Sequence, residues 1–217
     1  MCKIVFIMNN KIIFYFIFLL PFLNFSQTNA VTEYGDQVVL YDDGTWTYID
    51  GQIEEDVEIP INPEQYVKDE NSKFLLKSST LNVGIWIDTK DWKFKKALSN
   101  EDAEYELELK KEDLYGTVIT EKVEIPLATL RNIALSNAQD VAPDTKINKQ
   151  EYRTVNGIKV LMLEMSGTMS GIKFGYKGYY YSNENGTIQI ILYTAENLMD
   201  SYKDSTEKLL NGFVQID

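Results

Sequence analysis

The chain has 217 residues, of which 44% are hydrophobic and 12% aromatic, so disorder along its whole length is excluded. Its formal net charge of -12 argues against a nucleic-acid binder that follows the phosphate backbone, and against adsorption to anionic lipid. We expect one moderate domain with a core of its own, together with smaller appendages.

The first 26 residues have the pattern of an export signal. A short basic segment at residues 8–11 precedes an apolar run at residues 12–25, and Ser26 supplies a small residue at its end. We expect cleavage after Ser26 and export to the periplasm or the extracellular space. The alternative is an uncleaved anchor, which is disfavoured because the run is short for a membrane helix and Pro21 interrupts it. After cleavage we expect no stable membrane insertion.

The expected exported chain, residues 27–217, contains neither cysteine nor histidine. Cys2 is the only cysteine, and it lies within the signal or ahead of it, since translation starts at Met1 or at Met8. A Ser-His-Asp triad, a thiol nucleophile and metal or haem sites with imidazole or thiolate ligands are therefore excluded. We expect no cofactor. The exported chain has 19 basic residues against 33 acids, a charge of -14.

Residues 27–50 are expected to form an N-terminal β-hairpin. With Asp43-Gly44 as a two-residue turn, Tyr41 pairs with Trp46 across the strands. Its aromatic face is either a docking surface or packs on the main domain or on itself, and packing is favoured because an isolated hairpin is marginally stable. The stretch LYDDGTWTY at residues 40–48 resembles a short hairpin motif near the mature N-termini of many exported bacterial proteins.

An acidic linker and then the main domain are expected to follow. Residues 51–71 are rich in acids, contain Pro60 and Pro63 and lack apolar periodicity, so we expect them to be solvated. The main domain is expected over residues 72–217. Short apolar runs, and runs in which apolar and polar residues alternate, predict its first strands at residues 73–78, 82–88, 103–110 and 115–123.

Two helices are expected in the main domain. Pro126 opens the first, because a missing N–H costs nothing at the first helical position. The second is expected over residues 196–211, with Gly212 as its stop. Their buried stripes are predicted to consist of Leu127, Leu130, Ala134 and Ala138 in the first helix, and Leu198, Tyr202, Leu209 and Phe213 in the second.

Between the helices, residues 147–195 predict an antiparallel meander with strands at 147–155, 158–166, 172–182 and 187–195. Asn156-Gly157 and Asn185-Gly186 are expected as type I′ turns, because asparagine and glycine tolerate positive φ. Gly167 and Gly171 bound an expected looser loop. With Asn185-Gly186 at the turn, Tyr179 lies beside Leu192.

Both faces of this meander are apolar. Because successive side chains alternate between the faces, each face needs its own cover, and the fold class is α+β with packed layers on both sides of the sheet. One face is predicted to carry Tyr179, Tyr181, Ile188, Ile190 and Leu192, and the other Phe174, Tyr176, Tyr180, Ile191 and Tyr193.

Several spaced motifs of the main domain occur together in a fixed order. They are NVGIWID at 82–88 followed by Trp92, the Pro126 helix, the strand pair around Asn156-Gly157, GYKGYYY at 175–181, GTIQI at 186–190 and LLNGF at 209–213. With these motifs, the main domain resembles the PsbP/DcrB-like domain over about residues 72–217. The resemblance implies an αβα sandwich with a central antiparallel sheet, in a family of non-enzymatic accessory or binding proteins of the envelope or the thylakoid lumen.

Carboxylates are the remaining groups for catalysis. Asp88 with Asp91, and Glu101 with Asp102, are candidate pairs of the kind that glycosidases use, although solvated loop acids are the more common case. Glu164 lies in the middle of an apolar strand. We expect it to form a buried salt bridge with Lys159 or Lys177 rather than to act as a general acid.

Two functional hypotheses follow from these observations. The favoured one is a non-catalytic exported binding or accessory protein whose partner is an envelope protein or a glycan; the alternative is a carboxylate-based hydrolase acting on polysaccharide. Trp92 and Phe94, in an expected polar loop at residues 88–96, are candidate partner-contact residues. Trp92 either contacts a ligand or plugs the edge of the core, which is the favoured alternative.

Overall fold

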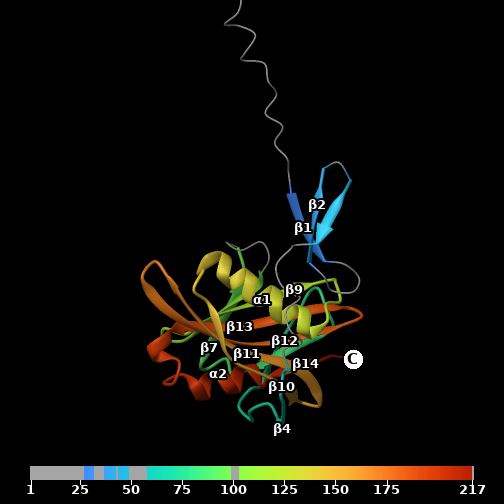
Figure 1. The fold of residues 1–217 in the computed structure, drawn as a ribbon. Helices are drawn as coiled ribbons and strands as arrows, with labels where there is room; N and C mark the ends of the chain where they lie inside the picture. The colour runs from blue at the N-terminus through green and yellow to red at the C-terminus, as the bar shows by residue number, and fades with distance from the viewer. Residues whose placement is uncertain (1–26, 32–36, 43, 49–57, 99–102, 217) are drawn as a thin grey trace, which may run out of the picture. The chain divides into compact units, whose positions relative to one another are not determined.

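The computed structural model describes residues 27–31, 37–42, 44–48, 58–98 and 103–216 (Figure 1). The chain divides into two compact units, Met1–Gly51 and Gln52–Asp217. The expected signal at residues 1–26 and the candidate acids Glu101 and Asp102 lie outside the described residues. Within the described part, no helix has both the length and the apolar character needed to cross a membrane.

The N-terminal unit contains the expected hairpin with one additional strand. Its antiparallel sheet has the order β1 (Gln27–Val31), β2 (Gln37–Tyr41) and β3 (Trp46–Tyr48). The predicted pairing is wrong by one residue, because Leu40 and not Tyr41 faces Trp46. The Tyr41 amide donates to the Thr45 carbonyl at 2.9 Å, and Gly44 has a φ of +83°. The loop is therefore one residue longer than a two-residue turn, with glycine in the left-handed position.

The main unit is built on an eight-stranded sheet. Every neighbouring pair is antiparallel except β4 and β10, which are parallel. The strand order is β4 (Ile61–Tyr66), β10 (Lys146–Val155), β11 (Ile158–Met169), β12 (Ile172–Asn183), β13 (Gly186–Ala195), β9 (Tyr115–Glu121), β8 (Ala103–Leu109) and β7 (Trp92–Lys96).

Strand β4 corrects the expected linker at residues 51–71. The Tyr152 amide donates to Pro60 and the Asn156 amide donates to Tyr66, both at 2.8 Å, so this segment is joined to the sheet by its backbone. An edge strand that is mostly exposed needs little apolar periodicity, and a proline is tolerated there. Residues 51–57 lie outside the described residues.

Helices cover both faces of the sheet, as expected for an α+β sandwich (Figure 1). Helix α1 (Leu127–Val141) packs on β11 and β12 from one side. Helix α2 (Lys203–Leu210) lies on the other side with a small sheet of order β14 (Phe213–Gln215), β6 (Val83–Ile87) and β5 (Phe74–Lys77). Successive side chains of β11 point to opposite faces of the sheet. Leu161 and Leu163 therefore pack in the core on the α1 side, while Met162 packs in the core on the α2 side.

The predicted meander is present, but the pairing register of its last two strands differs from the prediction. Tyr179 faces Ile190, and the turn consists of Glu184 and Asn185. Gly186 is already in β13, where a Cβ would collide with the Glu121 carbonyl of β9. Moving the turn by one residue shifts each partner by two positions, so every side chain keeps its predicted face.

The expected loop from Gly167 to Gly171 is instead mostly strand. Strand β11 continues to Met169, and Ser170 and Gly171, with φ of +51° and +81°, form a tight two-residue turn. Gly167 is needed for packing, since a Cβ there would clash with the Thr145 side chain.

The second expected helix is divided. Residues 196–211 contain a 3₁₀ turn, η3 (Glu196–Leu198), and then the shorter helix α2. Phe213 belongs to β14, where the Trp86 amide donates to the Gly212 carbonyl at 2.8 Å. The chain therefore becomes extended after Gly212, because pairing with β6 replaces the last helical turn.

A charged cleft between the sheet and the C-terminal segment

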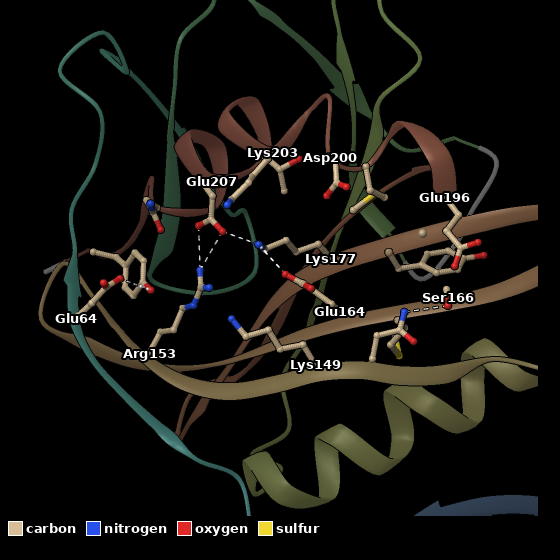
Figure 2. Close-up of a pocket in the computed structure, with 18 residues that line it drawn as sticks. Glu64, Lys149, Arg153, Glu164, Ser166, Lys177, Glu196, Asp200, Lys203 and Glu207 are labelled. Carbon is tan, nitrogen blue, oxygen red and sulfur yellow. Dashed lines mark hydrogen bonds and ion pairs between the residues drawn. The ribbon is translucent and has the colours of Figure 1, made fainter.

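A cavity of the main unit lies between the β10–β12 surface and the segment that carries η3 and α2 (Figure 2). Its volume is about 630 Å³. Charged side chains dominate its lining, with Lys149, Arg153, Glu164 and Lys177 from the sheet and Lys203 and Glu207 from α2.

A row of alternating charge crosses the floor of this cleft. Lys149 on β10 faces Glu164 on β11, which faces Lys177 on β12, so the three side chains lie on one face of the sheet. The Lys177 Nζ lies 2.9 Å from Glu164 Oε1, which confirms the predicted salt bridge. Lys159, the other predicted partner, lies 3.8 Å from the centre of the Tyr152 ring instead.

Arg153 is the most deeply buried cation of the cleft. Its side chain is 5% exposed, and its Nε donates to Glu151 Oε1 at 2.6 Å. Its Nη1 donates to the Tyr179 hydroxyl at 3.0 Å and to Glu207 Oε2 at 2.9 Å. The guanidinium also lies 4.4 Å from the centre of the Tyr66 ring. A buried arginine needs such partners, because removing its charge from water would otherwise be costly.

Glu207 attaches α2 to the sheet. Besides Arg153, it accepts a hydrogen bond from Lys177 Nζ at 2.5 Å. Lys149 in turn lies 3.2 Å from Glu151 Oε2. Three cations and three glutamates therefore form one neutral network (Figure 2 shows the part that lines the cleft).

The network also shifts the titration of Glu151. Burial by itself would raise the pKa of this carboxyl, but hydrogen bonds from Arg153 and Asn62 and the charge of Arg153 lower its pKa below the ordinary value. Glu151 is thus held as a carboxylate at neutral pH.

The carboxylates on the cleft floor are not arranged as a glycosidase pair. Glu164 and Glu207 converge on Lys177, whose ammonium group occupies the space between the two carboxylates. A glycosidase requires that space for the sugar and its leaving oxygen. Among the described residues, no group of three or more acid, histidine or cysteine side chains is placed to hold a metal ion.

The candidate pair Asp88 and Asp91 lies away from this cleft. The Asp88 Oδ1 accepts the Lys90 amide at 2.8 Å, and its carbonyl accepts the amide of Asp91 at 3.2 Å, so Asp88 shapes the turn before β7. Neither Asp88 nor Asp91 lines the large cleft.

Trp92 begins β7 instead of standing in a polar loop. It is 4% exposed and packs in the core on the α2 side, which is the position of a core residue. Phe94 is half-buried and stacks on Phe74 with 5.1 Å between the ring centres. A partner contact at Trp92 and Phe94 stays a prediction.

Sequence reasoning missed Arg153, Glu207 and the cleft itself. A local signal was present, because Lys149, Glu151 and Arg153 occupy alternate positions and must share a face of one strand. Glu207 gives no such signal, since 54 positions separate it from Arg153.

The comparison with solved structures identifies the fold. The solution structure of cyanobacterial PsbP (CyanoP) from Synechocystis sp. PCC 6803 matches with a TM-score of 0.50 and 14% identity, over 65% of this chain and 91% of that one. The main unit has a PsbP-like fold. Because the identity is low, the match establishes architecture and no residue role.

Two further structures match less closely than the PsbP structure. Protein PA94 of unknown function from Pseudomonas aeruginosa has a TM-score of 0.43 and 12% identity, over 66% of this chain and 97% of its own. LpqN of Mycobacterium tuberculosis, involved in cell envelope biogenesis, has a TM-score of 0.37 and 8% identity, over 89% of this chain and 92% of its own. No family model matches the chain, and no curated protein matches it.

Proposed function

We propose that this chain is a non-catalytic exported binding or accessory protein of the bacterial envelope, and that it binds through the charged cleft. The observation that carries the proposal is the neutral ion network beneath a cavity of about 630 Å³. In this network the charged groups of the cleft floor are paired with one another, and an open volume lies above them. A cavity with a fixed polar floor suits ligand recognition. The signal-like N-terminus supports the expected export.

The exported chain offers a direct test because it contains no cysteine. A single cysteine can be introduced by Lys203→Cys at the cleft, or by Asp140→Cys on α1 as the matched control, in a chain that also carries Cys2→Ser. Both positions are exposed and helical. Each variant is labelled with a photo-cross-linker, incubated with envelope extract and analysed by mass spectrometry.

Adducts at position 203 that are absent at position 140 are the expected result. Equal labelling at both positions would contradict binding through the cleft. Release of reducing sugar from envelope polysaccharide by the purified exported protein would contradict the non-catalytic assignment, and mass spectrometry of that protein also reports whether it starts at Gln27.

A further inference from the structure

A β-bulge lies in the floor of the cleft. Asn148 of β10 has no partner on β11, because its neighbours Ile147 and Lys149 face two consecutive residues of that strand. Ile147 packs in the core on the α1 side, whereas Asn148 and Lys149 both line the cleft. The bulge therefore turns two successive polar side chains to the same face of the sheet, which a regular strand cannot do.

The amide of Asn148 is held in place by a neighbouring hydroxyl. Its Nδ2 donates to the Ser166 Oγ at 2.8 Å, and Ser166 also lines the cleft (Figure 2). Asn148 is exposed, and no described residue donates a hydrogen bond to its Oδ1. The bulge and the hydroxyl together present an oriented acceptor on the floor of the cleft.

The wall opposite the bulge offers unpaired groups of both charges. Asp200 and Lys203 are exposed and line the cleft, and neither side chain has a hydrogen bond or ion pair with another described residue. On the floor, the Lys149 Nζ lies 3.2 Å from Glu151 Oε2, yet its side chain remains 50% exposed. The cleft therefore presents donors and acceptors together, with neither charge in clear excess (Figure 2).

This mixture of charges disfavours an ionic ligand. An anion would compete with the glutamates for Arg153 and Lys177, and displacing a glutamate from a buried pair is unfavourable. A cation would meet the ammonium groups of Lys149 and Lys203 in the same lining. A peptide strand is also disfavoured, because peptides add to a free sheet edge, whereas the cleft floor is a face of the interior strands β10, β11 and β12.

We propose that the cleft binds a neutral oligosaccharide, whose hydroxyl groups bond to Asn148 and Lys149 on the floor and to the wall opposite. A hydroxyl group both donates and accepts hydrogen bonds, so it can use these groups without breaking the ion pairs beneath them. Met199 lines the cleft and lies directly over Gly175, which gives an apolar surface for the C–H groups of a sugar ring. This inference rests on the proposed function, because it names the ligand class of the same cleft.

Titration calorimetry with trisaccharides of different charge tests this ligand class. Maltotriose, cellotriose and N,N′,N″-triacetylchitotriose are neutral, whereas chitotriose carries amines and trigalacturonic acid carries carboxylates. At least one neutral trisaccharide should bind, about tenfold or more tightly than either charged one, because a charged sugar meets a like charge or displaces a paired one. Its affinity should change less than about twofold as the ionic strength is raised. No binding of any neutral trisaccharide, or equally tight binding of a charged one, would overturn the inference.

Two pairs of variants locate the site. Asn148→Ala removes the oriented acceptor and should weaken binding of the neutral trisaccharide about five- to tenfold, whereas Asn137→Ala on α1 should leave it unchanged. Asp200→Ala should weaken it about tenfold, with Asp140→Ala on α1 as the matched control. All four positions are exposed, so the fold should be retained, which thermal unfolding checks. Equal losses in the cleft variants and their controls would contradict the proposed position.

The cross-linking experiment separates the two proposals. If adducts form at position 203 but no neutral trisaccharide binds, the cleft is a binding site and the carbohydrate assignment is wrong. If position 203 and position 140 are labelled equally and no neutral trisaccharide binds, both proposals are wrong.

Discussion

The two faces of the central sheet are built differently. Helix α1 covers an apolar surface in which Leu161, Leu163 and Tyr180 are fully buried. On the opposite face, the apolar core under β5 and β6 continues into a charged region where Arg153 and Lys177 are buried with their glutamates. Apolar packing alone can hold a helix on a sheet, so the charged region points to a purpose beyond stability.

That difference has a physical consequence for α2. Burial of apolar surface is insensitive to salt and nearly insensitive to pH, whereas an ion network depends on the protonation of its carboxyl groups. Helix α2 should therefore be the helix whose attachment responds to solution conditions.

The largest effect is expected in the apolar part of the α2-side core. Trp92→Ala removes a side chain that is 4% exposed, so it should lower the free energy of unfolding by about 3–5 kcal/mol and the melting temperature by several degrees. Thermal and denaturant unfolding measure both quantities. A change within about 0.5 kcal/mol, combined with loss of partner capture, would instead identify Trp92 as a contact residue.

A comparable loss of folding stability is expected when the charged region is disrupted, but this loss should depend on salt concentration. Arg153→Met leaves Glu151 and Glu207 without their shared cation and should cost about 3 kcal/mol. Leu163→Ala on the α1 side should cost about 2–5 kcal/mol by leaving a cavity. Added salt should reduce the first loss and leave the second unchanged. Equal salt dependence in the two variants would remove the contrast between the faces.

Part of the pH dependence of stability should come from Glu151. Its pKa is lowered in the folded protein, so its stabilising contribution is complete above the unfolded pKa, about 4.3, and disappears as the pH falls through the lower folded value. Glu151→Gln should therefore flatten the loss of stability below about pH 4.5, measured by urea unfolding at several pH values. Leu163→Ala should shift the curve downward without changing its slope; a slope unchanged by Glu151→Gln would contradict the prediction.

The smallest expected effect is a stabilisation. Thr206→Val removes a buried hydroxyl without a partner and should raise the free energy of unfolding by about 1 kcal/mol, as should Thr117→Val on β9. Denaturant midpoints measure both changes. Destabilisation of the Thr206 variant alone would mean that its hydroxyl is satisfied in solution.

Much of the main sheet could be predicted from the sequence because its signals are local. Asn156-Gly157 is a type I′ turn with φ of +48° and +84°, and the alternation of β12 assigned Tyr179 and Tyr180 to the correct faces. The register error at Asn185-Gly186 arose because that glycine serves close packing against β9.

The cleft could not be predicted in the same way. Its charged side chains come from β10, β11, β12 and α2, which meet only after the sheet and its cover have formed. The edge strand β4 was missed because its pairing is carried by the backbone while its side chains are mostly exposed. Local patterns predict which face a residue takes; they do not predict which distant residue covers it.

Amide hydrogen exchange with and without envelope extract tests most directly whether the protein binds through the charged cleft. If the charged cleft is the binding site, exchange at Lys203–Leu210 should slow when extract is added, while exchange at Leu127–Val141 stays the same. Slower exchange in both helices, or in α1 alone, would contradict the assignment of function to the charged face.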